Sequence, residues 1–109
     1  YHPIYHTQKY HSGVDIGASY GASIVAADGG TVITAGAVSG YGNCVVINHG
    51  NGITTLYGHM SSIAVSSGQK VSKGQTIGYV GSTGNSTGPH LHWEVTVNGV
   101  RQNPLNYAR

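Results

Sequence analysis

The sequence predicts an all-β protein, and three observations support this prediction. Short apolar runs are separated by glycine throughout, with 18 Gly in 109 residues. Gly50-Asn51-Gly52 lies between two such runs and is typical of a hairpin turn, whose residues need positive φ. No stretch shows apolar residues at the 3.6-residue spacing of an amphipathic helix. We therefore expect strands throughout and no helix beyond one turn near residues 61–64.

The elements follow in order from this pattern. Residues 1–9 are aromatic and without periodicity, so we expect a loop or edge segment that folds over the domain. Strands are expected where a short apolar run is bounded by turn residues. The predicted strands span residues 23–26, 30–35, 44–48, 53–59, 75–80 and 90–98. Asn98-Gly99 predicts another turn, and the tail after it is expected to pack on the surface.

Length and composition bound the organisation of the chain and exclude several classes of protein. A chain of 109 residues has room for one modest core, so we expect a single domain over residues 1–109. The net charge is +2 and the basic residues are scattered, which argues against binding to nucleic acid. No segment approaches the ~20 apolar residues of a membrane span. Cys44, the single cysteine, cannot form an internal disulfide, and its apolar neighbours predict a buried side chain.

A turn rich in glycine, serine and threonine at residues 84–88 leads into a strand with two histidines, His90 and His92. Side chains alternate along a strand, so His90, His92 and Glu94 share one face while Trp93 lies on the other. The two imidazoles are about 7 Å apart along the strand, close enough to serve one ion or one substrate group. One face of this strand is therefore predicted to carry a site and the other the core.

A catalytic zinc ion needs three protein ligands and an open position for water. His11 and Asp15 have the same strand parity, with a glycine between them that permits a bend, so both can converge on one ion. We predict His11, Asp15 and His92 as metal ligands, with His59 and His90 left over beside them. This set allows bound water to ionise near neutral pH.

The remaining polar residues are assigned more ordinary roles. His59 is expected near a strand end, on the same face as Tyr57. Glu94 is expected to support the site without binding the metal. Surface or packing positions are expected for His2 and His6, and His49, beside the hairpin turn, is expected to be a surface residue.

Three motifs together resemble one known family. They are His11-x-x-x-Asp15-Ile16-Gly17, Leu56-Tyr57-Gly58-His59 and the segment from Gly81-Ser82-Thr83-Gly84 to Pro89-His90-Leu91-His92-Trp93-Glu94. In this order they resemble the lysostaphin and LytM type of zinc metallopeptidases, and the likeness covers the chain from about His2 to Tyr107. The chain is thus expected to be one LytM-type catalytic domain.

The resemblance implies a two-layer antiparallel β fold with a substrate groove over the larger sheet. It also implies endopeptidase action on the peptides of peptidoglycan, with zinc held by His11, Asp15 and His92. His59 and His90 would act on the attacking water and the developing oxyanion, their individual roles being open. The bond cut is open as well: Gly-Gly, D,D or D,L. We expect a monomer that is secreted or faces the cell envelope.

The chain departs from the family pattern at two places. Family members carry a further N-terminal strand with a Phe-Gly-Tyr-Arg-like segment before the His2-Pro3 position, and this chain begins at Tyr1 without methionine. We therefore expect a processed or trimmed piece in which one groove wall is incomplete. Trp93 stands where Phe is commoner, which changes volume on the core face.

Three alternatives compete with this interpretation. A non-haem iron oxygenase also uses two histidines and one carboxylate, but it rarely needs two further histidines at its site. A catalytically weak wall-binding or activator module of the same fold is expected to lack a ligand, whereas all five positions are filled. Residues 84–88 match the Gly-x-Ser-x-Gly motif of serine hydrolases, but Pro89 and a strand follow where that motif needs a helix.

Overall fold

The computed structural model describes residues 8–9, 14–17, 19–81 and 90–102. Every regular element in this part of the chain is a strand, which confirms the predicted all-β class. The strands are β1 (Gln8–Lys9), β2 (Val14–Gly17), β3 (Ser23–Val25), β4 (Gly30–Val38), β5 (Gly42–Gly50), β6 (Ile53–Ile63), β7 (Lys70–Val71), β8 (Thr76–Val80), β9 (His90–Val97) and β10 (Val100–Gln102). Within these ranges no helix has the length and apolar character needed to cross a membrane.

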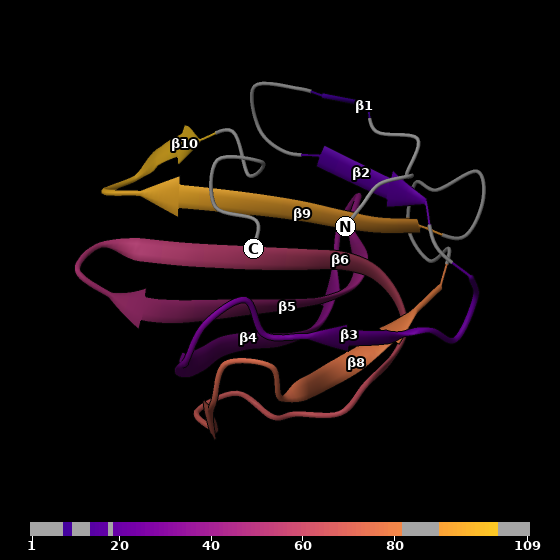
Figure 1. Cartoon of the computed structure of the whole chain (residues 1–109), viewed down its shortest axis with the longest axis horizontal. Coiled ribbons are helices and arrows are strands. Elements are labelled where there is room, and N and C mark those ends of the chain that lie inside the picture. Colours follow the sequence, from indigo (N-terminus) through magenta and orange to yellow (C-terminus); the bar gives the residue numbers. More distant parts are fainter. Residues whose placement is uncertain (1–7, 10–13, 18, 82–89, 103–109) are drawn as a thin grey trace.

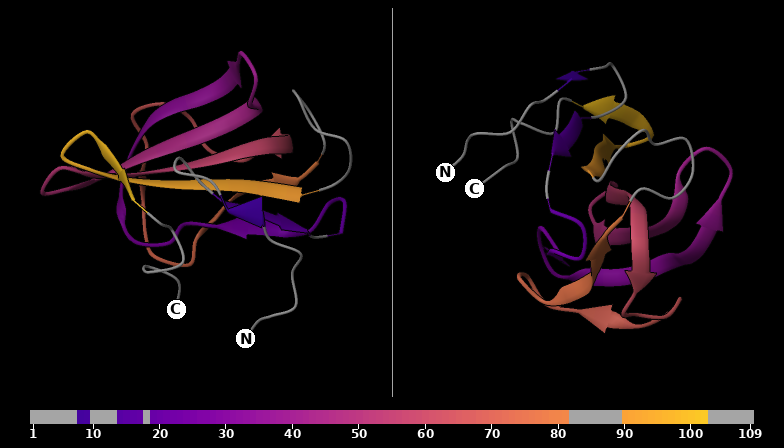
Figure 2. Two further views of the ribbon diagram at one scale, coloured as in Figure 1. Left: turned by 90° about the horizontal axis from the view of Figure 1, so that it is seen from above. Right: turned by 90° about the vertical axis from the view of Figure 1, so that its right-hand side faces the viewer.

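The described strands pair in antiparallel fashion in the order β1-β2-β9-β6-β5-β4-β7, and β10 pairs with β9. β8 pairs with both β3 and β6. Figure 1 shows β9, β6 and β5 as long neighbouring strands, with β3 and β8 below them. The two views in Figure 2 show the sheet curling round, and β3 and β8, which pair outside the main strand order, form the second layer. This is the two-layer antiparallel architecture that the family resemblance implies.

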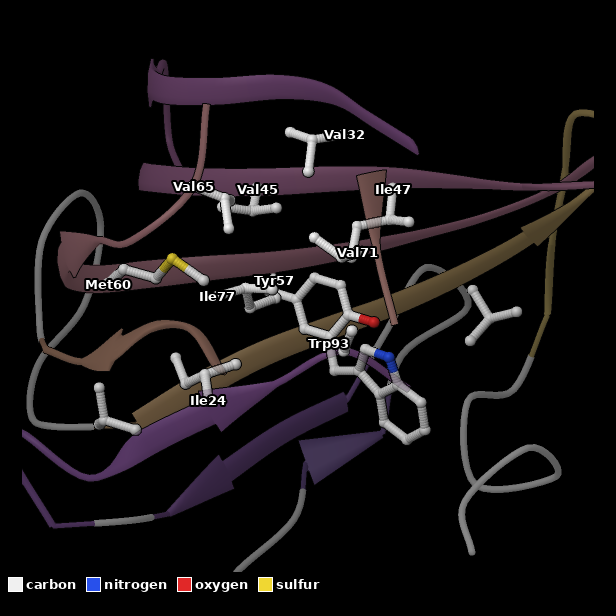
Figure 3. Packing of buried hydrophobic residues seen from close by; sticks show 13 residues of the cluster. Ile24, Val32, Val45, Ile47, Tyr57, Met60, Val65, Val71, Ile77 and Trp93 are labelled. Carbon is white, nitrogen blue, oxygen red and sulfur yellow. The ribbon is translucent and has the colours of Figure 1, made fainter. Parts of the chain in front are cut away.

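The hydrophobic core lies between the long strands and the layer made by β3 and β8. Its buried side chains come from both layers and include Ile24, Val32, Val45, Ile47, Tyr57, Met60, Ile77, Val80, Trp93 and Val95. Figure 3 shows the labelled side chains of this cluster converging on one interior, with Tyr57 beside Trp93. Burial of this apolar surface is the main force that holds the two layers together.

The predicted hairpin turns are present. Gly50, Asn51 and Gly52 have φ values of 90°, 53° and 78° between β5 and β6. Asn98 and Gly99 have φ values of 52° and 82° between β9 and β10, as a two-residue hairpin turn requires. The tail beyond Asn98-Gly99 therefore begins with a strand, β10, and residues 103–109 lie outside the described part.

The predicted helical turn near residues 61–64 is wrong. β6 continues to Ile63, where Ser62 pairs with Tyr79 and Ile63 pairs with Gly78 of β8. The serines at 61 and 62 resemble a turn in sequence, but backbone pairing with β8 keeps this segment extended. His59 consequently lies within a long strand and not at the end of a short one.

Candidate active site

The site is built on the outer face of β9 and β6. Their register places Tyr57 opposite Trp93 and Gly58 opposite His92. Trp93 belongs to the core, with 7% of its surface exposed. His92 and Glu94 alternate with Trp93 and therefore occupy the other face, as the sequence predicts. They are nonetheless buried, with 8% and 3% exposure.

β2 brings a second part of the predicted site to β9. The register places Asp15 opposite His92 and Gly17 opposite His90. Directly opposed residues of an antiparallel pair have Cα atoms about 4.5–5.5 Å apart. The backbones of Asp15, His90 and His92 thus lie together, although Asp15 and His90 are 75 positions apart in sequence. His11 and the side chains of Asp15 and His90 lie outside the described atoms.

His59 reaches this face through a β-bulge. Met60 pairs with Asn43 and Tyr57 pairs with Val45, so two residues of β6 lie opposite one residue of β5. Such a bulge shifts the alternation of side chains by one residue. Tyr57 and Met60 both enter the core, and the imidazole of His59 lies beside that of His92, with ring centroids 5.9 Å apart.

The prediction that His59 shares a face with Tyr57 is therefore wrong. Strict period-two alternation would place the His59 side chain in the core, and the extra residue of the bulge prevents this. The bulge marks the point where β6 changes partner, because pairing with β9 ends at Gly58 and pairing with β8 begins at Met60. The sequence contained a weak signal, a glycine before the histidine, which often accompanies a bulge.

The backbone of His59 is held on both sides. Its N–H donates to the carbonyl of Tyr41 over 2.7 Å, and its carbonyl accepts from the N–H of Gly81 over 3.0 Å. The side-chain amide of Asn43 donates to the carbonyl of Met60, the next residue, over 3.1 Å. These contacts keep His59 at φ 61°, a left-handed conformation that costs free energy for a non-glycine residue and is found at functional sites.

Glu94 and Tyr41 hold the imidazole of His92. Nε2 of His92 lies 2.8 Å from Oε2 of Glu94, and the hydroxyl of Tyr41 donates to the same oxygen over 2.7 Å. The Tyr41 ring also lies against the His92 ring, with centroids 5.4 Å apart. A carboxylate only accepts hydrogen bonds, so the proton of His92 belongs on Nε2 and the lone pair on Nδ1. Glu94 thus supports His92, as expected from the sequence.

Tyr41 is the site residue that sequence reasoning missed. It lies in the turn between β4 and β5, between Gly40 and Gly42, whose φ values are 84° and 67°. The turn packs directly against β6, because a Cβ atom at Gly58 would lie in ordinary van der Waals contact with Tyr41, 3.4 Å from its Cδ1. A tyrosine between two glycines in a turn was the available signal, but nothing local indicates that it contacts residues on β6 and β9.

Cys44 lies in β5 and is fully buried, as predicted. Burial, and secondarily the nearby charge of Glu94, raise the pKa of the Cys44 thiol from 9.0 to about 11. The side chain therefore stays a neutral thiol at physiological pH.

His49 is not the plain surface residue that the sequence predicted. Its Nδ1 lies 2.8 Å from the carbonyl of Gly29, and its Nε2 lies 2.7 Å from Oγ1 of Thr55. Thr55 in turn contacts the hydroxyl of Tyr57 over 2.8 Å, and the N–H of Ala27 donates to that hydroxyl over 3.0 Å. Burial raises the pKa of Tyr57. This hydrogen-bonded chain joins the segment before β4 to β5 and β6, away from His92.

A cavity of about 390 Å³ adjoins this series of hydrogen bonds and is lined in part by His49, Lys73, Trp93 and Val95. Because Trp93 and Val95 lie on the core face of β9, the cavity is on the opposite side of the sheet from His92 and Glu94. Nε1 of Trp93 is the one buried side-chain polar atom without a hydrogen-bond partner among the described residues. The cavity and the histidine site are therefore separate features.

The described atoms fit a metal at the histidine site. Nδ1 of His92 keeps its lone pair because Nε2 is engaged by Glu94, and the backbone of Asp15 lies directly across from His92. No three metal-binding side chains converge among the described residues, which exclude His11. An imidazole nitrogen next to a carboxylate-bearing strand is the donor chemistry that zinc prefers.

The chain belongs to peptidase family M23, whose family model matches residues 9–104. It is 47% identical over 107 residues to DD-carboxypeptidase/endopeptidase Mpg of Neisseria meningitidis, and the aligned region covers 98% of this chain and 25% of that protein. It is also 42% identical over 96 residues to the murein hydrolase activator NlpD of Salmonella typhimurium, covering 87% of this chain and 25% of that protein. The chain thus spans about a quarter of the length of these relatives.

Solved structures share the fold. The catalytic domain of lysostaphin from Staphylococcus simulans superposes with a TM-score of 0.84 at 36% identity, covering 89% of this chain and 77% of that chain. A zinc-containing peptidase from Vibrio cholerae superposes with a TM-score of 0.81 at 39% identity, covering 84% of this chain and 28% of that chain. The family is zinc-dependent, which confirms the predicted cofactor class.

Proposed function

We propose that this chain is the catalytic domain of a zinc-dependent endopeptidase that hydrolyses peptide bonds in peptidoglycan stem peptides or cross-bridges. The observation that carries the proposal is the meeting of three strands at one point. β2 places Asp15 opposite His92, and the β6 bulge brings the ring of His59 to 5.9 Å from that of His92. Membership of peptidase family M23 supports the same reaction class.

His11, Asp15 and His92 would hold the zinc ion. The register of Asp15 and His92 supports two of these ligands, and the motif spacing supports His11. When bound, zinc polarises the scissile carbonyl and lowers the pKa of a water molecule. Two imidazoles and one carboxylate leave a place open for that chemistry.

His59 and His90 would carry out the proton chemistry. One imidazole accepts the proton of the attacking water, and the other donates a hydrogen bond to the oxyanion that develops on the carbonyl. His59 is 6% exposed and has its backbone fixed on both sides, so its ring needs little reorganisation during the reaction. This preorganisation favours stabilisation of the developing charge.

The substrate and location follow from the relatives. Mpg is named for D,D-carboxypeptidase and endopeptidase activity, and we propose a peptidoglycan peptide as the substrate here too. Because peptidoglycan lies outside the cytoplasmic membrane, the domain would act in the cell envelope or after secretion. We propose that it acts as a monomer, since the proposed residues all come from one chain.

Digestion of defined muropeptides with and without a chelator, followed by mass analysis of the products, tests the proposal. We expect cleavage that a chelator stops and zinc restores, and the product masses name the bond. His92→Ala should lose both zinc and activity. His49→Gln is the matched control, because it removes an imidazole outside the site and should keep zinc and turnover. Zinc-independent cleavage, or full activity of His92→Ala, would contradict the proposal.

The second candidate is an activator or wall-binding module of the same fold, favoured by the similarity to the murein hydrolase activator NlpD. In that case the purified chain should leave muropeptides uncut at saturating zinc. It should instead raise the rate of a separate cell-wall hydrolase when the two are mixed. Cleavage or no cleavage of muropeptides by the purified chain with zinc therefore separates the two candidates directly.

A further inference from the structure

Tyr41 contacts His59 and His92 through different atoms. Its carbonyl accepts the N–H of His59 over 2.7 Å. Its hydroxyl donates over 2.7 Å to Oε2 of Glu94, which lies 2.8 Å from Nε2 of His92. Its ring lies against the ring of His92 at 5.4 Å between centroids. The turn between β4 and β5 is thereby tied to both β6 and β9.

Glu94 is an unusual residue to find at this depth. It is 3% exposed, and a buried carboxylate is costly unless donors compensate it. Two donors converge on one oxygen, the hydroxyl of Tyr41 and Nε2 of His92. A carboxylate that accepts a hydrogen bond from one imidazole nitrogen keeps the proton on that nitrogen, and the lone pair with which the ring can bind a metal is then on the other nitrogen.

We infer that Tyr41 and Glu94 are positioning residues for the proposed zinc site: Glu94 keeps the proton of His92 on Nε2, Nδ1 is presented to the metal, and Tyr41 orients Glu94. The inference rests on the proposed function. It adds Tyr41 to the site and gives Glu94 a specific role there, and neither residue binds zinc or touches substrate.

The turn that carries Tyr41 also places His59. The Tyr41 carbonyl and the Asn43 side chain hold backbone groups of two consecutive residues of β6, the N–H of His59 and the carbonyl of Met60. The same short segment therefore sets the position of His59 through its backbone and the orientation of His92 through a side chain. Removing only the Tyr41 hydroxyl should disturb His92 and leave the backbone contact with His59 intact.

Zinc affinity and the tautomer of His92 test this inference in the full chain. Tyr41→Phe keeps the ring and the carbonyl but loses the hydroxyl, and Glu94→Gln keeps the shape but loses the charge. Tyr57→Phe is the matched control, because it removes a buried phenol hydroxyl from the opposite face of the same sheet. Zinc affinity is measured by competition with a chromophoric chelator, and folding by the denaturant midpoint of each variant.

Loss of a partner behind a metal-binding histidine weakens metal binding about 10–100-fold, which we expect for Glu94→Gln. Tyr41→Phe acts one hydrogen bond further away, so a smaller loss is expected, up to about tenfold. Tyr57→Phe should lower the denaturant midpoint and leave zinc affinity unchanged. Imidazole ¹⁵N spectra of the zinc-free parent should show His92 protonated on Nε2, and Glu94→Gln should show a mixture of tautomers.

Parent-like zinc affinity in Tyr41→Phe and Glu94→Gln would overturn the inference and leave the proposed function standing. An Nδ1-protonated His92 in the parent would overturn it as well. Equal weakening by Tyr57→Phe would show a general effect of stability and would also overturn it. A parent chain that neither binds zinc nor cleaves muropeptides would overturn the proposed function and, with it, this inference.

Discussion

His59 is held in a backbone conformation that side chains other than glycine rarely adopt. Its φ of 61° falls in the left-handed region, which costs an L-residue roughly 1–2 kcal/mol. The hydrogen bonds to Tyr41 and Gly81 hold it there. The strain is local, and its benefit is to place an imidazole on the outer face of a strand whose neighbours Tyr57 and Met60 enter the core.

A pair of substitutions at this position separates backbone strain from chemistry. His59→Gly and His59→Ala both remove the imidazole, and both should bind zinc while losing roughly 10²-fold or more in rate. Glycine has no penalty at positive φ. The free energy of unfolding of His59→Gly should therefore exceed that of His59→Ala by about 1 kcal/mol. Within strands the alanine variant is usually more stable than the glycine variant, so the expected order of stability is reversed here. Equal or greater stability of the alanine variant in urea would contradict the strain.

Cys44 predicts a pH dependence of stability. Its pKa is about 11 in the folded protein against 9.0 ordinarily, so the folded state holds this proton more tightly than the unfolded state. The stabilisation is present below pH 9 and is lost as the pH rises toward 11. Two pKa units correspond to about 3 kcal/mol.

Denaturant unfolding at several values between pH 7 and pH 11 measures this dependence. The parent chain should lose stability over the upper part of the range more steeply than Cys44→Ala, which lacks the thiol. Subtraction of the two curves removes the contribution of the tyrosines. Parallel curves for the two proteins would mean that the Cys44 thiol does not titrate abnormally.

At the scale of elements, the close approach of β8 to β6 determines how the bulge is held. A Cβ atom on Gly81 would clash with the backbone nitrogen of Ser61 and lie 2.7 Å from its Cα. The hydrogen bond from Gly81 to the carbonyl of His59 depends on this approach. The glycine in the motif before the His-x-His strand is thus required by packing between two strands.

Gly81→Ala should therefore be destabilising by about 1–3 kcal/mol, the usual cost of overpacking. It should also lower the rate, because β8 must move away from His59. Gly36→Ala in β4 is the control: a Cβ atom there meets nothing within 4 Å, so stability and rate should be close to those of the parent. Thermal unfolding and muropeptide turnover report the two effects, and a parent-like Gly81→Ala would disprove the close contact.

At the scale of the whole molecule, the proposed metal joins distant parts of the chain. Asp15 on β2 and His92 on β9 come from opposite ends of the sequence and meet only through the register of these two strands. Within the described sheet, β2 is paired to β9 and to the short strand β1. A ligand that binds only the folded state stabilises that state by mass action.

Zinc should consequently raise the thermal midpoint of the parent chain. At a free zinc concentration 100 times the Kd, the free energy of unfolding should increase by about 2.7 kcal/mol. Asp15→Ala and His92→Ala should lose this gain, whereas His49→Gln should keep it. Calorimetry with and without zinc provides the measurement, and an equal gain in all four proteins would place the metal elsewhere.

Much of the fold could be predicted because the relevant signals are local. The alternation of His92, Trp93 and Glu94 follows from the geometry of one strand, and the turns at Asn51 and Asn98 follow from residues that tolerate positive φ. The continuation of β6 beyond His59 could not be predicted in this way. It depends on pairing with β8, and the serines at 61 and 62 indicate a turn when considered alone.

Sequence pattern was enough to predict the all-β class, the division of β9 into a site face and a core face, and the family through its motifs, but not the short strands β1, β2, β7 and β10. The tertiary structure alone decided which way His59 points, that His49 joins a hydrogen-bonded chain, and that Tyr41 reaches Glu94 from 53 positions away. Periodicity and turn propensity depend on neighbours in sequence. A bulge and a contact between strands depend on register, which is settled only when the whole sheet pairs.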